Sequence, residues 1–162
     1  MKGVIVYESY YGNTKILAEA IAEQLKVEGY EVELRSVREH YPESLQGDIM
    51  FLGSPVRMGS VSGRVKRYVK KLDKDVWKDK PIVVFTTTLM LPKDATDKQK
   101  RSQEKWDRSA GHKLRDLAKS RGLNAVENHL WVEVKGMKGP LVETGVENAK
   151  QFVRDILLSL KD

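Results

Sequence analysis

The chain has 162 residues, of which 40% are hydrophobic and 32% are charged, a composition typical of a globular domain rather than a disordered segment. It contains no cysteine, which excludes disulfides, iron–sulfur clusters, thiolate zinc sites and a cysteine nucleophile. The net charge is +6. A chain of this length can bury roughly 68–70% of its unfolded surface, so we expect residues 1–162 to form a single domain.

Strand-like and helix-like patterns alternate along the chain. Ile16, Leu17, Ala20, Ile21 and Leu25, for example, recur at helical spacing after a short apolar run. Strands are predicted at residues 4–7, 31–37, 48–53, 82–85 and 130–134, and helices at 13–28, 60–72, 99–121 and 146–160.

This alternation predicts an α/β fold. Short continuous apolar strands between amphipathic helices indicate a parallel sheet that is covered on both faces. Right-handed crossovers leave few topologies, and we expect a doubly wound five-stranded parallel sheet of order 2-1-3-4-5. The segment 36–47 is too short and broken for a full helix. In such a sheet a ligand binds at the carboxyl ends of the strands, here in the loops that follow the first, third and fourth strands.

The first of these loops has the composition of an oxyanion site. It consists of Ser9, Tyr10, Tyr11, Gly12, Asn13 and Thr14. Hydroxyl groups and the free N–H groups of a helix start attract a phosphate, and glycine lets the backbone approach it. No lysine-containing P-loop motif is present, so we expect neutral donors to hold the phosphate. An ordinary helix cap would use the same residue types.

The other two loops suit a planar ring. The second loop runs from Gly53 to Ser60 and includes Pro55, Val56, Arg57, Met58 and Gly59. Its backbone could run along the edge of a ring system, and a plain β–α turn is the alternative. In the third loop, hydroxyl side chains precede an apolar triplet that could cover a heterocycle or instead pack under the next helix. This loop runs from Thr86 to Pro92 and includes Thr87, Thr88, Leu89 and Met90.

Two of these motifs resemble those of a known family. The pattern Ser-x-x-Gly-Asn-Thr at residues 9–14 is similar to the phosphate loop of flavodoxins. The segment 53–63 resembles the second flavin loop of flavodoxin-like quinone reductases and protoporphyrinogen dehydrogenases. The resemblance covers essentially the whole chain and implies the flavodoxin-like fold.

The resemblance also implies the cofactor FMN. Residues 9–14 would hold its phosphate, residues 55–59 would line the isoalloxazine, and Thr87 to Met90 would line its other side and the ribityl chain. Electron-carrier flavodoxins are typically acidic and stack aromatic rings on the flavin from the second and third loops. This chain is basic and has no aromatic residue in those two loops.

The expected function is electron transfer between redox partners on FMN, and the alternative is an FMN-dependent oxidoreductase. That enzyme would reduce a quinone with NAD(P)H or oxidise a porphyrinogen. The loops contain no acid–base pair or nucleophile, so no catalytic side chain is predicted and the chemistry would belong to the flavin. The oligomeric state is left open.

Charge and composition also bear on partners and location. Residues 64–80 carry eight basic and three acidic side chains, residues 93–121 carry ten and five, and the rest of the chain is net −4. These segments could be a solvated helix surface or could dock an acidic redox protein, and no motif supports nucleic-acid binding. The histidines at 40, 112 and 129 show no metal-ligand spacing. Without a long apolar run or room for a signal peptide, we expect a cytoplasmic protein with no membrane span.

Overall fold

The computed structural model describes residues 1–39 and 45–161. The strands are β1 (Lys2–Tyr7), β2 (Glu31–Ser36), β3 (Ile49–Arg57), β4 (Ser60–Val61), β5 (Ile82–Leu89) and β6 (Leu130–Val134). The helices are α1 (Asn13–Val27), α2 (Gly63–Lys71), α3 (Lys74–Trp77), α4 (Asp97–Gln103), the π-helical turn η1 (Glu104–Arg108), α5 (Ser109–Ser120) and α6 (Gly145–Leu160).

The central sheet has the strand order β2-β1-β3-β5-β6, with every neighbouring pair parallel. Counted without β4, this is the predicted order 2-1-3-4-5, so the fold-class prediction is confirmed. The short strand β4 is an addition to it, because it pairs antiparallel with the end of β3 outside the five-strand path.

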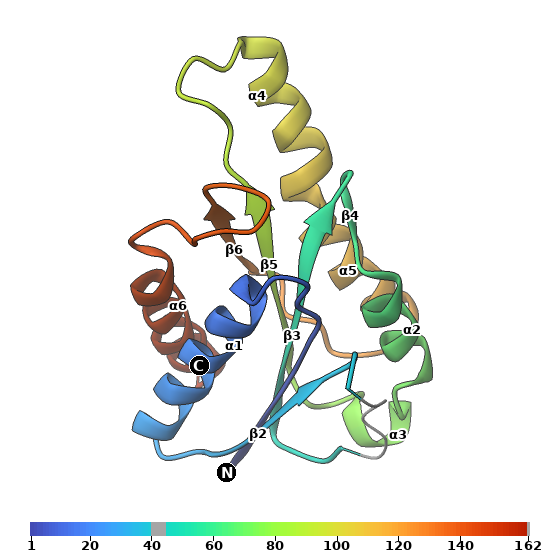
Figure 1. Ribbon diagram of the computed structural model, residues 1–162. Coiled ribbons are helices and arrows are strands. Elements are labelled where there is room, and N and C mark those ends of the chain that lie inside the picture. Colours follow the sequence, from blue (N-terminus) through green and yellow to red (C-terminus); the bar gives the residue numbers. More distant parts are fainter. Residues whose placement is uncertain (40–44, 162) are drawn as a thin grey trace.

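Helices cover both faces of the sheet. Figure 1 shows α1 and α6 on one face and α2, α3 and α5 on the other. Successive side chains of a strand point to opposite faces, so Ile5 and Tyr7 of β1 join the core under α1 and α6. Val4 and Val6 join the core on the other face. Burial on both faces explains why the strands are continuously apolar in sequence.

Two strands are longer than predicted. β3 continues past Gly53 to Arg57, and β5 continues past Phe85 to Leu89. The three threonines at 86–88 therefore lie within a strand rather than in a loop after it. Because Ser60 and Val61 pair with β3, helix α2 begins at Gly63 and not at residue 60.

The helix predicted at 99–121 differs most from the prediction. It starts at Asp97 and is interrupted by η1, a π-helical turn over Glu104–Arg108. Such a turn places an extra residue in the helix and rotates the side chains that follow. The helix α3 was not predicted. Within the segment 36–47, residues 40–44 lie outside the described part of the chain, and His40 is one of them.

Candidate cofactor site

A pocket of about 480 Å³ lies at the carboxyl edge of the sheet. This volume is in the range of pockets that bind small molecules and cofactors. Its walls come from the loop after β1, the start of α1, the ends of β3, β5 and β6, the turn after β3, the loop after β6 and η1. The lining residues are Ser9, Tyr10, Tyr11, Asn13, Thr14, Pro55, Val56, Arg57, Met58, Thr87, Leu89, Asp107, Val134 and Met137.

The loop after β1 and Thr87 of β5 form one end of the pocket, which we call the hydroxyl end. Gly12 adopts a left-handed conformation (φ 96°) immediately before α1, and its N–H donates to the Ser9 hydroxyl at 3.0 Å. Within the described residues, no side chain caps α1, and its first turn contains no acidic residue. Its N-terminal N–H groups and the positive end of its dipole are therefore available to an anion.

Thr14 joins this loop to β5. Its side-chain oxygen lies 2.8 Å from that of Thr87, and only 2% of Thr14 is exposed. Because strand side chains alternate, Thr87 faces α1 while its neighbours Thr86 and Thr88 face the opposite side of the sheet. Thr88, which the sequence analysis also assigned to the site, is buried and is not among the lining residues of the pocket.

The opposite end of the pocket, which we call the apolar end, is formed by the β3–β4 hairpin together with Leu89 and Met137. Met58 (φ 51°) and Gly59 (φ 74°) make the two-residue turn of the hairpin, and both take the positive φ that a type I′ turn requires. Met58 is fully exposed. A Cβ on Gly59 would lie 3.0 Å from the Cβ of Trp106, so η1 packs directly on this turn.

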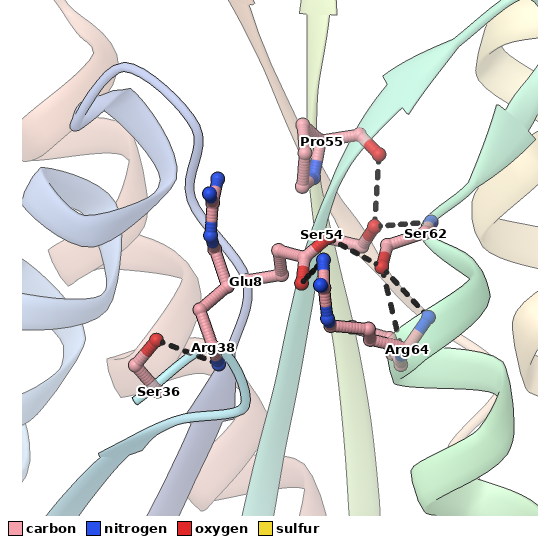
Figure 2. A network of polar contacts seen from close by, with 8 residues as sticks. Glu8, Ser36, Arg38, Ser54, Pro55, Ser62 and Arg64 are labelled. Atoms are coloured by element: carbon pink, nitrogen blue, oxygen red, sulfur yellow. Dashed lines mark hydrogen bonds and ion pairs between the residues drawn. The ribbon is translucent and has the colours of Figure 1, made fainter. Parts of the chain in front are cut away.

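A buried carboxylate connects the first two loops beneath the pocket. Glu8 is fully buried and accepts a hydrogen bond of 2.8 Å from the Ser62 hydroxyl, with Arg64 at 3.7 Å from its other oxygen (Figure 2). Ser62 also caps α2, and its N–H donates to the Ser54 hydroxyl at 2.8 Å. The end of β1 is thereby fixed against β3 and the start of α2.

Tyr10 extends this network into the pocket. Its hydroxyl bonds to Glu8, and this hydrogen bond, followed by burial, raises the pKa of the phenol above its usual value. The guanidinium of Arg57 lies 3.9 Å from the centre of the Tyr10 ring, a cation–π contact between the first loop and β3. Arg57 thus lies at the boundary between the two ends of the pocket.

Asp107 of η1 places a carboxylate at the apolar end. It lines the pocket and accepts a hydrogen bond from the Gly59 N–H. Burial raises the pKa of the Asp107 carboxyl above its usual value, and the Gly59 N–H opposes this rise in part. Sequence reasoning missed this residue, because its position depends on the π-helical turn.

The loop between β6 and α6 contributes Val134 and Met137, which sequence reasoning also missed. This loop reaches the hydroxyl end as well, since a Cβ on Gly139 would lie 2.5 Å from the Asn13 side-chain oxygen. The predicted strand order could have indicated that the loop after the last strand contributes to the pocket. The last strand lies beside the fourth, so its carboxyl-end loop must face the same edge.

The structure brings most of the predicted residues together around the pocket. The exceptions, which are not among its lining residues, are Gly12, Gly59, Thr88 and Met90. Gly12 and Gly59 instead shape the loop and the hairpin turn. The Met90 N–H donates to the Val134 carbonyl at 2.8 Å, so its backbone continues the pairing of β5 with β6.

The arrangement suits a ligand that is anionic at one end and planar and apolar at the other. The hydroxyl end offers N–H and O–H donors, and the nearby Glu8 is engaged with Ser62 and Arg64 below the pocket. The apolar end offers aliphatic and thioether side chains that can contact an aromatic face. FMN combines these features, so the residues present fit the cofactor that the sequence motifs imply.

Comparisons with known proteins agree with the fold and identify the family. A sequence model of the flavodoxin domain matches residues 4–128. A flavodoxin from Aquifex aeolicus is 40% identical over 78 residues, and this match spans 47% of the chain and only 42% of the relative. An archaeal flavodoxin structure superposes with a TM-score of 0.74 at 17% identity over the full length of both chains. Flavodoxin 1 from Bacillus cereus gives 0.67 at 20% identity over 97% of each chain.

Proposed function

This chain belongs to the flavodoxin domain family, whose members bind FMN, and we propose that it carries electrons between redox proteins on that cofactor. The observation that carries the proposal is the two-ended pocket at the carboxyl edge of the sheet. One end is suited to a phosphate and the other to a planar ring, and the loops of both ends are held together by Glu8, Tyr10 and Arg57.

We assign the FMN phosphate to the hydroxyl end. The Thr14 hydroxyl and the free N–H groups at the start of α1 would donate to it, and Gly12 allows the loop to turn around it. The remaining residues assigned to this end are Ser9, Tyr10, Tyr11 and Asn13. Binding of the phosphate at the hydroxyl end would not require a lysine or arginine there, because the fold already orients backbone N–H and hydroxyl donors toward it.

We assign the isoalloxazine ring to the apolar end. Pro55, Val56, Met58 and Leu89 would contact it, with Thr87 near the ribityl chain. Bound FMN supplies the electron-transfer chemistry, and the protein supplies position and electrostatics. Arg57 would favour negative charge on the reduced cofactor, and its contact with Tyr10 holds the guanidinium in place.

The surface around the apolar end suits an acidic redox partner. Exposed apolar side chains surround the pocket, namely Tyr11, Met58, Leu89, Trp106 and Met137. Lys105 and Lys113 lie over the Trp106 ring at 5.6 and 5.5 Å, so positive charge flanks this surface. Both basic segments, 64–80 and 93–121, belong to elements on or beyond one face of the sheet (Figure 1). Opposite charge on the partner would steer the encounter.

None of the helices in residues 1–39 and 45–161 is both long and apolar enough to cross a bilayer. We propose that the protein works in the cytoplasm, where reduced redox partners are available. The absence of cysteine agrees with this compartment but does not require it.

Cofactor binding tests the first part of the proposal. The purified protein should be yellow, and the apoprotein should quench the fluorescence of added FMN with one-to-one stoichiometry. Riboflavin, which lacks the phosphate, should bind much more weakly because the hydroxyl end would stay unfilled. A well-folded apoprotein that binds neither compound would overturn the assignment.

The docking surface is tested by electron transfer from an acidic plant-type [2Fe–2S] ferredoxin. We expect the rate to fall as salt rises and to fall several-fold in Lys105→Glu. Lys26→Glu makes the same charge change in the last turn of α1, away from the pocket, and should leave the rate unchanged. Equal rates in all three proteins would contradict the docking proposal. Steady oxidation of NADPH by a quinone would instead favour an oxidoreductase.

A further inference from the structure

Asp107 is the one acidic side chain among the residues that line the pocket, and the proposed electron-transfer role does not use it. It lies in η1, where the π-helical turn rotates it toward the β3–β4 hairpin. Its carboxylate accepts from the N–H of Gly59, the second residue of the hairpin turn. A half-buried carboxylate therefore lies beside the surface to which we assign the flavin ring.

Asp107 takes part in none of the ion pairs of this structure's described residues, 1–39 and 45–161. Five basic side chains of β3, η1, α5 and the loop after β6 lie over aromatic rings: Arg57 over Tyr10, Lys105 and Lys113 over Trp106, Arg108 over Trp131 and Lys138 over Tyr11. The other titratable groups near the pocket are Glu8, which bonds to Ser62, and the phenols of Tyr10 and Tyr11.

Burial without a cationic partner already disfavours the charged form of this carboxyl. The pKa of Asp107 is raised by desolvation, and the Gly59 N–H offsets only part of this. A second negative charge placed in the same pocket would raise the pKa further, because like charges at short range disfavour each other's ionisation. Reduction of a flavin at the apolar end would supply such a charge.

We propose that Asp107 is the proton-binding group of this pocket: its carboxylate holds the Gly59 N–H while the flavin is oxidised and takes up a proton from solvent when the flavin becomes negatively charged. This inference rests on the proposed function. When a redox donor delivers two electrons, bound FMN would take up one proton and Asp107 would take up a second, and both protons would be released on reoxidation. Asp107 thereby compensates the charge on the reduced cofactor and fixes the hairpin turn through Gly59.

The first test measures the two-electron reduction potential of the holoprotein between about pH 5 and about pH 8. We expect the slope of the wild-type protein to correspond to two protons per two electrons over part of this range, and that of Asp107→Asn to one. Asp107→Asn should also have the higher potential at the alkaline end, because it lacks the negative charge. Glu104→Gln makes the same charge change at an exposed position of η1 and should behave like wild type. Equal slopes in Asp107→Asn and wild type would overturn the proposal.

The second test needs no flavin. In the labelled apoprotein, the amide resonance of Gly59 should shift with pH together with the Asp107 carboxyl, with a midpoint above the usual pKa of aspartate. The shift should vanish in Asp107→Asn and persist in Glu104→Gln. A Gly59 amide that does not respond, in a protein that binds FMN normally, would overturn the proposal and leave the proposed function intact. A titrating Gly59 in a protein that cannot bind FMN would overturn the proposed function and the proton uptake that depends on it.

Discussion

At the hydroxyl end of the pocket, Thr14 is almost completely buried and hydrogen-bonded to Thr87, whereas at the apolar end Met58 is completely exposed at the tip of a hairpin. The first end is held from below by Glu8, Ser62 and Ser54. The second is held from above, where Trp106 packs on Gly59 and Asp107 accepts from its N–H.

This difference matches two separate tasks. Binding a phosphate requires donors whose positions are set before the ligand arrives, because reorganisation would reduce affinity. Exchanging electrons with another protein requires that the edge of the ring be reachable from outside. Exposed side chains such as Met58 and Leu89 make that edge accessible, and they add little to the stability of the fold.

The largest effect we expect comes from the support beneath the hydroxyl end. Glu8→Ala would leave the buried Ser62 hydroxyl without its acceptor and open a cavity, lowering the free energy of unfolding by about 2–3 kcal/mol. Chemical denaturation of the apoprotein measures this loss. Glu8→Gln keeps an acceptor for Ser62 and should lose clearly less. If both variants were as stable as wild type, the hydrogen bonds and the ion pair of Glu8 in Figure 2 would not stabilise the hydroxyl end.

A smaller effect is expected from the hydroxyl that faces the phosphate. Thr14→Val keeps the shape of the side chain but removes a hydrogen bond to a charged group, so FMN should bind about 10- to 30-fold more weakly. Fluorescence titration of the apoprotein measures the affinity, and Thr14→Ser, which keeps the hydroxyl, is the control.

At the apolar end, Leu89→Ala should change the affinity for FMN only a few-fold. The two ends would not differ as described if Leu89→Ala were the more damaging change.

The hairpin turn provides the next test. Gly59→Ala places a side chain at positive φ and against Trp106, and we expect a loss of about 1–1.5 kcal/mol in the free energy of unfolding. Gly63→Ala is the matched control, because Gly63 lies in the first turn of α2 with open space around its Cβ position. The Gly63 variant should be as stable as wild type. Comparable losses in both would show that η1 does not restrain the turn.

The smallest effect concerns a region remote from both ends. His129 packs against His112, with 4.4 Å between ring centres, and desolvation followed by the charges of His112 and Arg115 lowers its pKa to about 4. The unfolded chain binds a proton near pH 6.5 and the folded protein does not. Stability is therefore complete above that pH and is lost as the pH falls toward 4.

After allowance for the partial exposure of the ring, this loss should be about 1 kcal/mol. Urea denaturation at about pH 7 and about pH 4.5 measures it in wild type and in His129→Gln. The variant should show a weaker pH dependence, while FMN affinity at neutral pH should not change. An unchanged pH dependence in His129→Gln would assign the acid sensitivity to other groups.

Much of the site could be predicted because its loops lie where strand order requires them to lie. Ser9 to Thr14 follow β1, and Pro55 to Met58 lie at the end of β3 and in the turn after it. Both strands are recognisable from continuous apolar runs, and parallel strands bring their carboxyl ends to one edge. The prediction for the third loop was less accurate. β5 continues to Leu89, so strand alternation directs Thr87 toward the pocket and Thr88 away from it.

Asp107 and Met137 illustrate why the remaining residues were missed. The spacing of apolar residues in 99–121 is compatible with a continuous α-helix, and the π-helical turn that rotates Asp107 toward Gly59 has no distinct pattern in the sequence. Met137 lies in the loop after β6, and Gly139 of the same loop lies close to the side chain of Asn13 in α1.

The amino-acid sequence alone was enough to predict the α/β architecture, the strand order and the edge of the sheet that carries the pocket. These properties follow from hydrophobic periodicity and from the handedness of crossovers, which act locally along the chain. Only the tertiary structure decided which of the candidate side chains meet, that Glu8 supports the pocket from below, and that Asp107 enters it. Each of these depends on contacts between residues far apart in sequence, and such contacts arise only when the helices pack on the sheet.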